Sequence, residues 1–435
     1  MVAVTTGWFA PVARLGWGVA DQGVASLGNF AFSILVAKAL SPNEFGAFAL
    51  AWVTYGMLLN LSRGLATDPL VVRFSHGGHS AWRSAVQAST GTAVAVGAVS
   101  GVVCVGVGSV LSQPLGTAVM ALGVVLPGLL LQDALRFASF AAGRPAVAFA
   151  NDVVWATLQT LSAAALYLTC HVTVATATLA FGATALVAAM VGWLQLRVLP
   201  HVGRVRWWLV TQRSLALRYA AENLSISGAR QLRMTLLGVI AGLAAVGQVR
   251  AAEILMGPFM VILMGVSQVA VPEGVRVLQR SGHRLLRFSL LLGSVQALAA
   301  VAWGALMIVL VPRGLGELLL GELWVGAYAL LLPVLINMAV GCFENGAMTG
   351  VRALGAARHS LAAQLSNAAL YLVGGVGGAV LDGARGSCWG VACATTIATG
   401  IWWSRLLRAY HEHDFHDRRD EPSSRPAAVT VQEAQ

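Results

Sequence analysis

Charged side chains inside long apolar stretches are the residues of this sequence best placed to do chemistry. Arg63, Arg230 and Arg233 each lie deep in such a stretch, with no acidic residue one helical turn away. Inserting a lone arginine into a bilayer costs about 2.5 to 3.5 kcal/mol, so such groups face a protein interior or an aqueous cavity. Guanidinium groups donate paired hydrogen bonds to phosphate oxygens and stay charged at any working pH. The three arginines therefore indicate a binding site for an anion such as a diphosphate.

Four acidic residues within apolar stretches allow two further readings. They are Asp21, Asp133, Glu222 and Glu344. Asp21, Glu222 or Glu344 could pair with the three arginines across helices, because a buried charge needs an opposite charge close by. Alternatively, Asp21 together with Asp133 or Glu344 could bind a coupling cation. Both readings stay open at this stage.

Other buried charges have simpler explanations. Asp133 and Arg136 are three residues apart, as are Arg250 and Glu253, so each pair shares a helix face and is expected to neutralise itself. Asp152 lies near the end of an apolar stretch, where capping at the membrane interface is the expected role.

The composition places these residues in a membrane protein. Hydrophobic residues make up 57% of the 435 residues, charged residues only 11%, and the mean hydropathy is +0.74. Soluble domains are about a quarter charged, so no soluble class fits. The formal charge of +10 therefore has to be read by its position relative to the membrane, and it does not predict a nucleic-acid partner.

The apolar stretches predict about twelve transmembrane helices, each near the roughly 20 residues that a bilayer needs. The expected spans are 15–40, 45–71, 85–111, 115–140, 146–169, 174–199, 219–246, 251–275, 285–311, 326–350, 361–381 and 387–407.

The basic residues predict the orientation of these spans. Of the 28 Lys and Arg residues, three lie inside spans and only Lys38, Arg250, Arg313 and Arg385 fall on one side. The rest fall on the other side, which the positive-inside rule makes the cytoplasm. We therefore expect a multi-pass protein of the cytoplasmic (inner) membrane with both termini cytoplasmic.

The chain is expected to be all-α and to divide into two halves. Residues 1–200 would form one six-helix bundle, 201–218 a basic cytoplasmic linker lying on anionic headgroups, 219–410 a second six-helix bundle and 411–435 a disordered tail. The halves can be laid on one another with Gly247 opposite Gly46, which suggests an internal repeat.

A tight hairpin connects the first two spans. Residues 35–50 read LVAKALSPNEFGAFAL. Pro42 cannot continue the first helix, Ser41 and Asn43 can cap the second, and Glu44 would lie in its first turn, where the helix dipole favours a carboxylate. The stretch is therefore expected to be a turn between two antiparallel helices.

This hairpin, after an Asn-bearing helix, resembles the first hairpin of polysaccharide flippases, a branch of the multidrug/oligosaccharidyl-lipid/polysaccharide exporter superfamily. Further stretches carry the resemblance: LATDPLVVRFS from Leu65, LPGLLLQDALRFASFAAGRPAVAFANDVVW from Leu126 and ENLSISGARQLRMTLLG from Glu222. It covers most of the chain up to about Tyr410. No position matches the sodium or proton sites of the drug-exporting branch.

The resemblance implies two six-helix bundles, as in multidrug and toxin extrusion proteins, around a cavity that opens alternately to each side. It implies a transporter of lipid-linked oligosaccharide, with Arg63, Arg230 and Arg233 as the cationic residues that bind the headgroup diphosphate. Expected partners are this substrate, membrane lipids and polysaccharide assembly proteins; no metal or cofactor is expected. A cation-coupled drug or metabolite antiporter is the alternative. An enzyme is disfavoured because no long outer loop could hold an active site.

Overall fold

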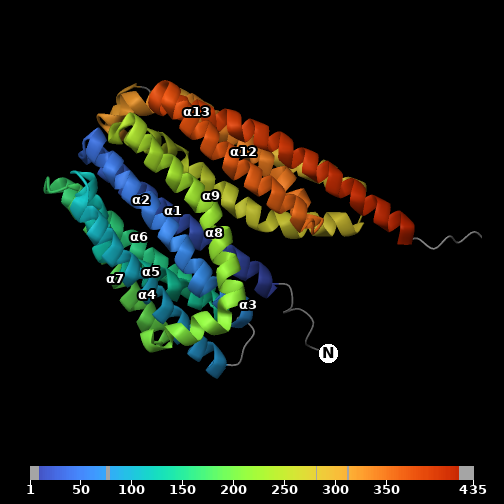
Figure 1. Cartoon of the computed structure of the whole chain (residues 1–435), viewed down its shortest axis with the longest axis horizontal. Coiled ribbons are helices and arrows are strands. Elements are labelled where there is room, and N and C mark those ends of the chain that lie inside the picture. Colours follow the sequence, from blue (N-terminus) through green and yellow to red (C-terminus); the bar gives the residue numbers. More distant parts are fainter. Residues whose placement is uncertain (1–8, 75–78, 281, 311–312, 421–435) are drawn as a thin grey trace, which may run out of the picture.

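The computed structural model is helical throughout the residues that it describes, which are 9–74, 79–280, 282–310 and 313–420 (Figure 1). The first half of the chain contains α1 (Phe9–Ala39), α2 (Pro42–Ser62), the π-helical turn η1 (Arg63–Thr67), α3 (Asp68–Phe74), α4 (His79–Val110), α5 (Leu115–Ala141), α6 (Pro145–Leu168) and α7 (Val174–Leu196). α2, η1 and α3 run on without a break, so they form one long rod.

The second half follows the short 3-10 helix η2 (Val202–Arg204). It contains α8 (Val205–Ala241), α9 (Leu243–Arg280), α10 (Gly282–Leu310), α11 (Arg313–Leu320), α12 (Leu323–Ala353) and α13 (Ala357–Asp420). α13 is interrupted at Asp382 and Gly383, where the backbone leaves the helical region, so it consists of two arms.

These elements match the expected spans one by one. The α2–η1–α3 rod lies at the expected second span, and the two arms of α13 lie at the last two expected spans. α11 is a short helix that the sequence did not predict. Seven helical stretches are long and apolar enough to cross a membrane; they are Pro42–Phe74, Ala81–Val110, Leu115–Ala141, Val174–Leu196, Arg284–Val309, Leu323–Ala353 and Arg358–His413. The expected all-α membrane fold is confirmed.

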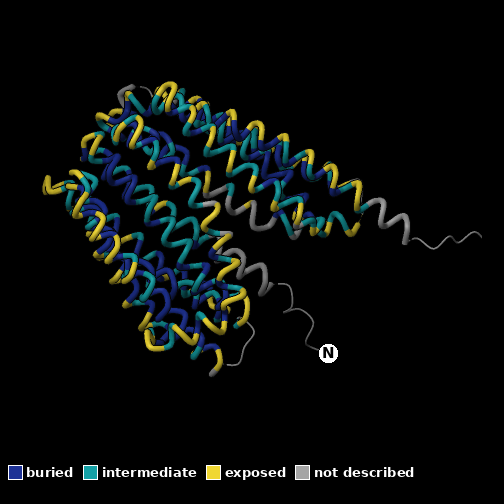
Figure 2. Tube along the Cα trace, viewed as in Figure 1, coloured by how far each residue is buried: buried dark blue, intermediate teal, exposed yellow. Residues whose placement is uncertain are grey.

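Helix packing in the first half is repeated in the second. α4 packs on α5, α5 on α7 and α1 on α6; correspondingly, α10 packs on α12, α12 on α13 and α8 on α13. In Figure 1 the blue-to-green helices and the yellow-to-red helices form two groups. The groups meet near the bend of α13 and diverge toward the end of the molecule where α1 begins and α13 ends. Buried residues lie between packed helices and exposed ones on the outer faces (Figure 2).

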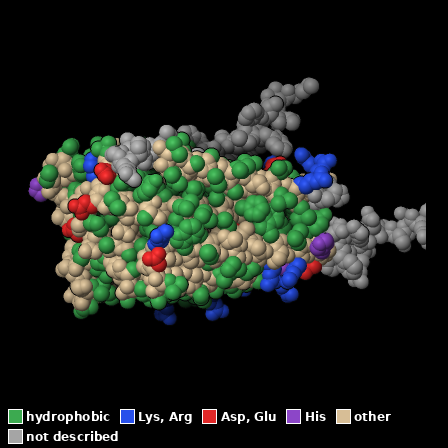
Figure 3. All heavy atoms as spheres, turned by 90° about the horizontal axis from the view of Figure 1, so that it is seen from above, with side chains coloured by type: hydrophobic (Ala, Val, Ile, Leu, Met, Phe, Trp, Pro, Cys, Tyr) green, Lys and Arg blue, Asp and Glu red, His purple; other side chains and the backbone are tan. Residues whose placement is uncertain are grey.

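The outer surface suits a membrane. The face in Figure 3 is largely apolar, and its charged side chains gather mainly toward the two ends of the molecule. Large side chains such as Val110, Val239 and Leu381 are mostly exposed on the helices, as lipid-facing residues would be.

The expected first hairpin is confirmed. Ser41 caps α2 with Pro42 at its first position, and the Glu44 amide donates to the Ser41 hydroxyl. The Glu44 carboxylate in turn accepts from the Ser41 amide at 3.0 Å and from its hydroxyl at 2.7 Å. This reciprocal capping box satisfies backbone donors that would otherwise be left at the start of α2.

Two expected boundaries differ in the structure. Residues 205–218 are the first turns of α8, with Trp208 buried against the end of the first bundle, so no separate linker precedes the seventh span. α13 continues to Asp420, so the first ten residues of the expected disordered tail are helical. The remainder, 421–435, lies outside the described residues.

The two arms of α13 pack through glycines. Gly378 faces Gly386 and Gly374 faces Gly390, and a Cβ atom at Gly378 would overlap the Gly386 carbonyl oxygen. Glycine allows this close backbone approach, which in a membrane supplies much of the packing energy between helices.

The adjacent Gly377 provides a matched control for this contact, because a Cβ atom there meets nothing within 4 Å. We expect Gly378→Ala to destabilise the protein by about 1 to 3 kcal/mol through overpacking. Gly377→Ala should leave the thermal unfolding midpoint of the detergent-purified protein unchanged or slightly higher. Equal midpoints for the two variants would show that the arms are not held by this contact.

Candidate functional site

The π-helical turn η1 positions Arg63. In a π-helical turn the backbone hydrogen bonds reach one residue further than in an α-helix, and such turns are often found at functional sites. Arg63 donates from Nε to Asp133 Oδ2 at 3.0 Å and from Nη2 to Asp133 Oδ1 at 2.7 Å, and its guanidinium lies over the Phe137 ring. The Arg63 side chain is 27% exposed, and its Nη1 has no hydrogen-bond partner among the described residues. One edge of the guanidinium is therefore free to bind a ligand.

Arg136 joins three helices of the first bundle. It lies on α5 and forms ion pairs with Asp21 of α1 and, at 2.9 Å, with Asp152 of α6. Both carboxylates are essentially completely buried. The expectation that Asp133 and Arg136 neutralise each other was wrong. Asp133 pairs with Arg63, and Arg136 pairs with Asp21 and Asp152. The interfacial role expected for Asp152 was also wrong.

This cluster carries unbalanced charge. It combines three carboxylates, Asp21, Asp133 and Asp152, with two guanidiniums, so its formal charge is negative if all are ionised. Gln132 supplies a further donor to Asp152 Oδ1 at 3.1 Å, whereas Asp21 Oδ1 is buried without a hydrogen-bond partner among the described residues. A proton or a small cation would balance the cluster.

Arg233 is buried in the second half of the molecule. Its Nη2 donates to Glu253 of α9 at 3.2 Å, and its guanidinium lies over the Tyr371 ring of α13. Glu253 also pairs with Arg250 at 3.4 Å, which confirms that expected pair. Arg233 thus has a carboxylate partner across helices, although not one of the partners considered from the sequence.

Arg230 differs from the other two arginines. It is exposed and takes part in no salt bridge within the described part of the chain. Its neighbour Gln231 donates from Nε2 to the Thr54 hydroxyl of α2 at 3.0 Å. The backbone of Arg230 therefore lies at about the same height in the membrane as Thr54.

Arg63 and Arg230 lie at different heights on the α2–α8 seam. Nine residues separate Thr54 from Arg63, which corresponds to about 13 Å along a helix that rises 1.5 Å per residue. The three arginines have different surroundings in this conformation: Arg63 pairs with Asp133, Arg233 pairs with Glu253, and Arg230 forms no salt bridge within the described residues.

Glu344 is a buried carboxylate without a cation. It lies on α12 and accepts from Asn367 Nδ2 at 2.9 Å and from the Thr399 hydroxyl at 3.3 Å, one from each arm of α13. No Lys, Arg or His forms a salt bridge with it among the described residues. The Glu222 side chain, the fourth acidic candidate, lies outside what the structure describes.

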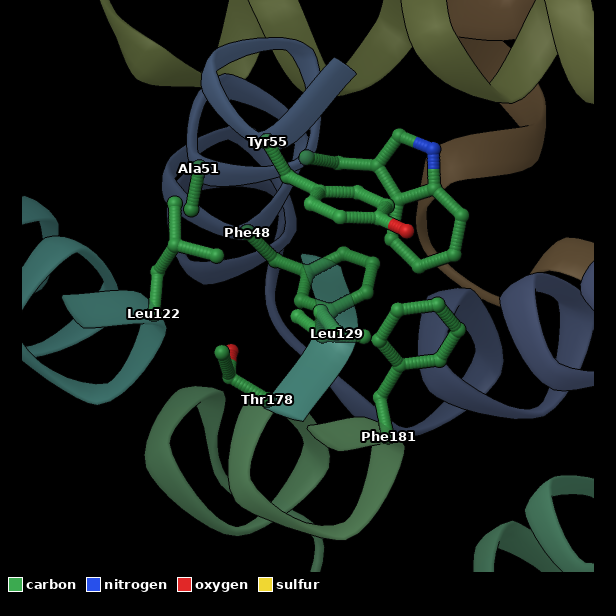
Figure 4. Close-up of a pocket in the computed structure, with 8 residues that line it drawn as sticks. Phe48, Ala51, Tyr55, Leu122, Leu129, Thr178 and Phe181 are labelled. Atoms are coloured by element: carbon green, nitrogen blue, oxygen red, sulfur yellow. The ribbon is translucent and has the colours of Figure 1, made fainter. Parts of the chain in front are cut away.

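An aromatic pocket adjoins the Arg63 site on the same helix. α2 contributes Phe48, Ala51, Trp52 and Tyr55, while α5 and α7 contribute Leu122, Leu129, Thr178 and Phe181. In Figure 4 the rings of Phe48, Tyr55 and Phe181 point toward one another across this pocket. The lining is apolar apart from the Tyr55 and Thr178 hydroxyls and the Trp52 indole nitrogen. The rings pack closely, with the Trp52 and Phe181 centroids 4.6 Å apart, so the pocket is a small gap within an aromatic cluster of the first bundle.

The role of Arg136 does not follow from spacing along one helix, but it does follow from the depths of the charged residues in their spans. Asp21, Arg136 and Asp152 each lie only a few residues from the same end of their expected spans. Residues at equal depth on different helices can meet, whereas spacing along one helix reveals only neighbours on that helix. Glu253 was missed as the partner of Arg233 for the same reason.

Removing Arg136 should leave Asp21 and Asp152 buried without a counter-charge. We expect Arg136→Ala to lower the free energy of unfolding by about 3 to 5 kcal/mol, measured as a lower thermal midpoint and less folded protein in the membrane. The exposed Arg144 is the matched control, and Arg144→Ala should behave like the unmodified protein.

A neutral version of the cluster separates charge from packing. The triple variant Asp21→Asn, Arg136→Met, Asp152→Asn should recover most of the lost stability, since no unpaired charge is left. An Arg136→Ala protein with an unchanged midpoint would contradict the central role of this guanidinium.

Comparisons with known proteins agree with this architecture. No family model matches the chain, and no curated protein matches it. Among solved structures, an inward-facing multidrug resistance MATE family transporter of the MOP superfamily superposes with a TM-score of 0.72 at 15% identity, covering 90% of this chain and 96% of that one. An outward-facing structure of such a transporter gives 0.57 at 15% identity, covering 93% and 96%.

A flippase has the same fold. The lipid II flippase MurJ, in an inward closed conformation, superposes with a TM-score of 0.68 at 10% identity, covering 92% of this chain and 90% of that one. Identities this low show the fold alone. The chain therefore shares the two-bundle fold of MATE transporters and of MurJ, with its helices arranged more like the inward-facing than the outward-facing MATE structure.

Proposed function

We propose that this protein is a transporter that moves a lipid-linked oligosaccharide across the cytoplasmic membrane by alternating access. The fold supports transport, because its structural neighbours are transporters and a flippase. The resemblance of the first hairpin supports the polysaccharide branch. Both termini would be cytoplasmic, and polysaccharide assembly proteins would be the partners that supply or consume the substrate.

The observation that carries the proposal is the pair of free guanidinium donors on the α2–α8 seam. Arg63 keeps Nη1 free beside its bidentate bond to Asp133, and Arg230 has no salt bridge within the described residues. Along the axis of the α2–η1–α3 rod, the backbones of the two arginines lie on opposite sides of the midpoint of the rod. An anionic headgroup entering between the bundles would meet both.

A diphosphate matches this arrangement chemically. Each guanidinium donates in a planar fork that fits phosphate oxygens, and neither loses its charge at working pH. Because the two lie about 13 Å apart along the helix axis, they suit successive positions of a moving headgroup better than a single cradle. Arg233 would join them only in a conformation in which its bond to Glu253 is broken.

Arg230 offers a clean test, because no carboxylate within the described residues pairs with it. We expect Arg230→Ala to lower transport of an undecaprenyl-diphosphate-linked oligosaccharide into proteoliposomes about 10-fold to 100-fold, the loss of one charged hydrogen-bonding group. Arg230→Lys should retain partial activity, since it keeps the charge without the fork. The amount and thermal midpoint of both proteins should stay unchanged.

Arg63 needs a compensated variant, because Arg63→Ala would strand Asp133. The double variant Arg63→Gln, Asp133→Asn removes both charges together and should lose transport while remaining folded. Arg385→Ala, at an exposed arginine in the second arm of α13, serves as the control and should transport normally. Normal transport by both Arg230→Ala and the double variant would refute the headgroup site.

A second candidate function, cation-coupled antiport of a drug or metabolite, is favoured by a separate observation. Each bundle buries carboxylate charge that its own arginines do not balance: Asp21 Oδ1 is unpartnered in the first, and Glu344 has only amide and hydroxyl donors in the second. Binding and release of a proton or cation at such groups could drive the movement of another solute.

Gradient dependence tests this candidate. In proteoliposomes with an imposed proton or sodium gradient, Asp21→Asn or Glu344→Gln should remove the gradient's effect on transport, because the coupling group can no longer change its charge. The control Glu317→Gln, at an exposed glutamate of α11, should keep it. Transport that is equally fast with and without either gradient in the unmodified protein would exclude coupling.

A further inference from the structure

The first turns of α8 have two faces of opposite character. One face is buried against the end of the first bundle and carries Trp208, Gln212, Ala216 and Ala220 at intervals of four residues. Trp208 Nε1 donates to the Leu65 carbonyl at 3.1 Å, and Gln212 Oε1 accepts from Arg73 Nη1 at 2.8 Å. The segment is therefore held firmly in place by protein contacts on this face.

The opposite face is exposed and mixes cationic with apolar side chains. Arg206, Arg213 and Arg218 are exposed, and between them lie Trp207, Val210 and Leu217, whose exposed fractions are 49%, 63% and 67%. The helix is already held to the bundle by the buried contacts of its other face. Packing within the protein therefore does not explain why these three large apolar groups face outward.

No acidic side chain within the described residues pairs with the charge of this face. No acidic residue occurs between Asp152 and Glu222, whereas five arginines lie between Arg197 and Arg218. Arg206, Arg213 and Arg218 form no salt bridge within the described ranges. Three unpaired cations close together attract an anionic partner.

The position of the face selects the kind of partner. α8 contacts η1, η2, α3 and α4 here, so these turns cross an end of the bundle, where helices leave the hydrocarbon region (Figure 1). Tryptophan and interspersed aliphatic groups favour the boundary between acyl chains and headgroups, and arginines beside them favour anionic lipids. A soluble anion would match the arginines but not Trp207, Val210 and Leu217.

We propose that residues 206–218 of α8 form a docking surface for anionic phospholipid, with Trp207, Val210 and Leu217 inserted at the interface and Arg206, Arg213 and Arg218 bound to headgroups. The surface fixes the depth and tilt of the first bundle in the leaflet. This inference does not depend on the transported substrate.

Quenching of Trp207 fluorescence by brominated lipid tests the surface in the full chain. The protein is reconstituted in vesicles of phosphatidylcholine and phosphatidylglycerol, with the bromine carried by one lipid or the other, and Trp207→Phe identifies the contribution of Trp207. The unmodified protein should show stronger quenching of Trp207 by brominated phosphatidylglycerol than by brominated phosphatidylcholine. The difference should fall as salt is raised.

The triple variant Arg206→Gln, Arg213→Gln, Arg218→Gln should lose this preference. Each arginine near a charged leaflet contributes about 1 kcal/mol, roughly fivefold in lipid affinity, so the variant's preference should fall at least fivefold. The control Arg352→Gln, Arg358→Gln, Arg408→Gln changes three other exposed arginines and should keep the preference.

Three outcomes would overturn the proposal. They are equal quenching of Trp207 by the two lipids in the unmodified protein, a preference that survives the Arg206, Arg213 and Arg218 substitutions, and no quenching of Trp207 by either lipid. Unchanged thermal midpoints in neutral detergent would show that the variants fold, as expected for exposed side chains without protein partners.

Discussion

A charge inside a bilayer must find its counter-charge within the protein, and this constraint determines how the helices of the first bundle are held together. Arg136 pairs with carboxylates from α1 and α6, and Arg63 binds Asp133, so these direct bonds join four helical segments. Since lipid offers no hydrophobic driving force between helices, such polar bonds and close glycine contacts take over part of the role of an apolar core. The ion pairs thus determine which helices move as one unit.

The bundles meet each other through a different kind of contact. Gly46 of α2 and Gly247 of α9, the two positions matched in the repeat, lie against one another: a Cβ atom on Gly247 would be 2.7 Å from the Pro42 carbonyl oxygen and 3.4 Å from the Gly46 Cα. If the two halves are repeats, this is the contact expected where a symmetry axis passes between equivalent residues. No salt bridge joins α2 to α9 within the described residues, so this end of the interface can open without breaking buried charge pairs.

Much of the fold could be predicted from the sequence because the bilayer imposes a length and a polarity on every span. The capping box at Ser41 and Glu44 and the limits of most spans follow from local rules of this kind. The partners of the charged residues could not be predicted in the same way. Asp133 and Arg136 share a helix face yet bind different helices, and Arg233 is paired with Glu253 of the next helix, because side-chain pairing depends on which helices are adjacent.

The first turns of α8 were misjudged as a linker for the opposite reason: their composition suits a surface segment, while a single stripe of Trp208, Gln212 and Ala216 attaches them to the bundle.

The two bundles are packed alike but charged differently, and this difference bears on how they would move. In the first bundle each carboxylate of the Asp21, Asp133 and Asp152 cluster has a guanidinium in contact, so its helices are linked by ion pairs. In the second, Glu344 is held only by neutral donors from the two arms of α13 among the described residues, so no ion pair fixes α12 there. A cycle between two conformations needs a rigid frame and an element whose equilibrium a ligand can shift. The first bundle, tied by Arg136 and attached to the start of α8, has the properties of the frame, and the contact between α12 and the arms of α13 at Glu344 has those of the element that responds.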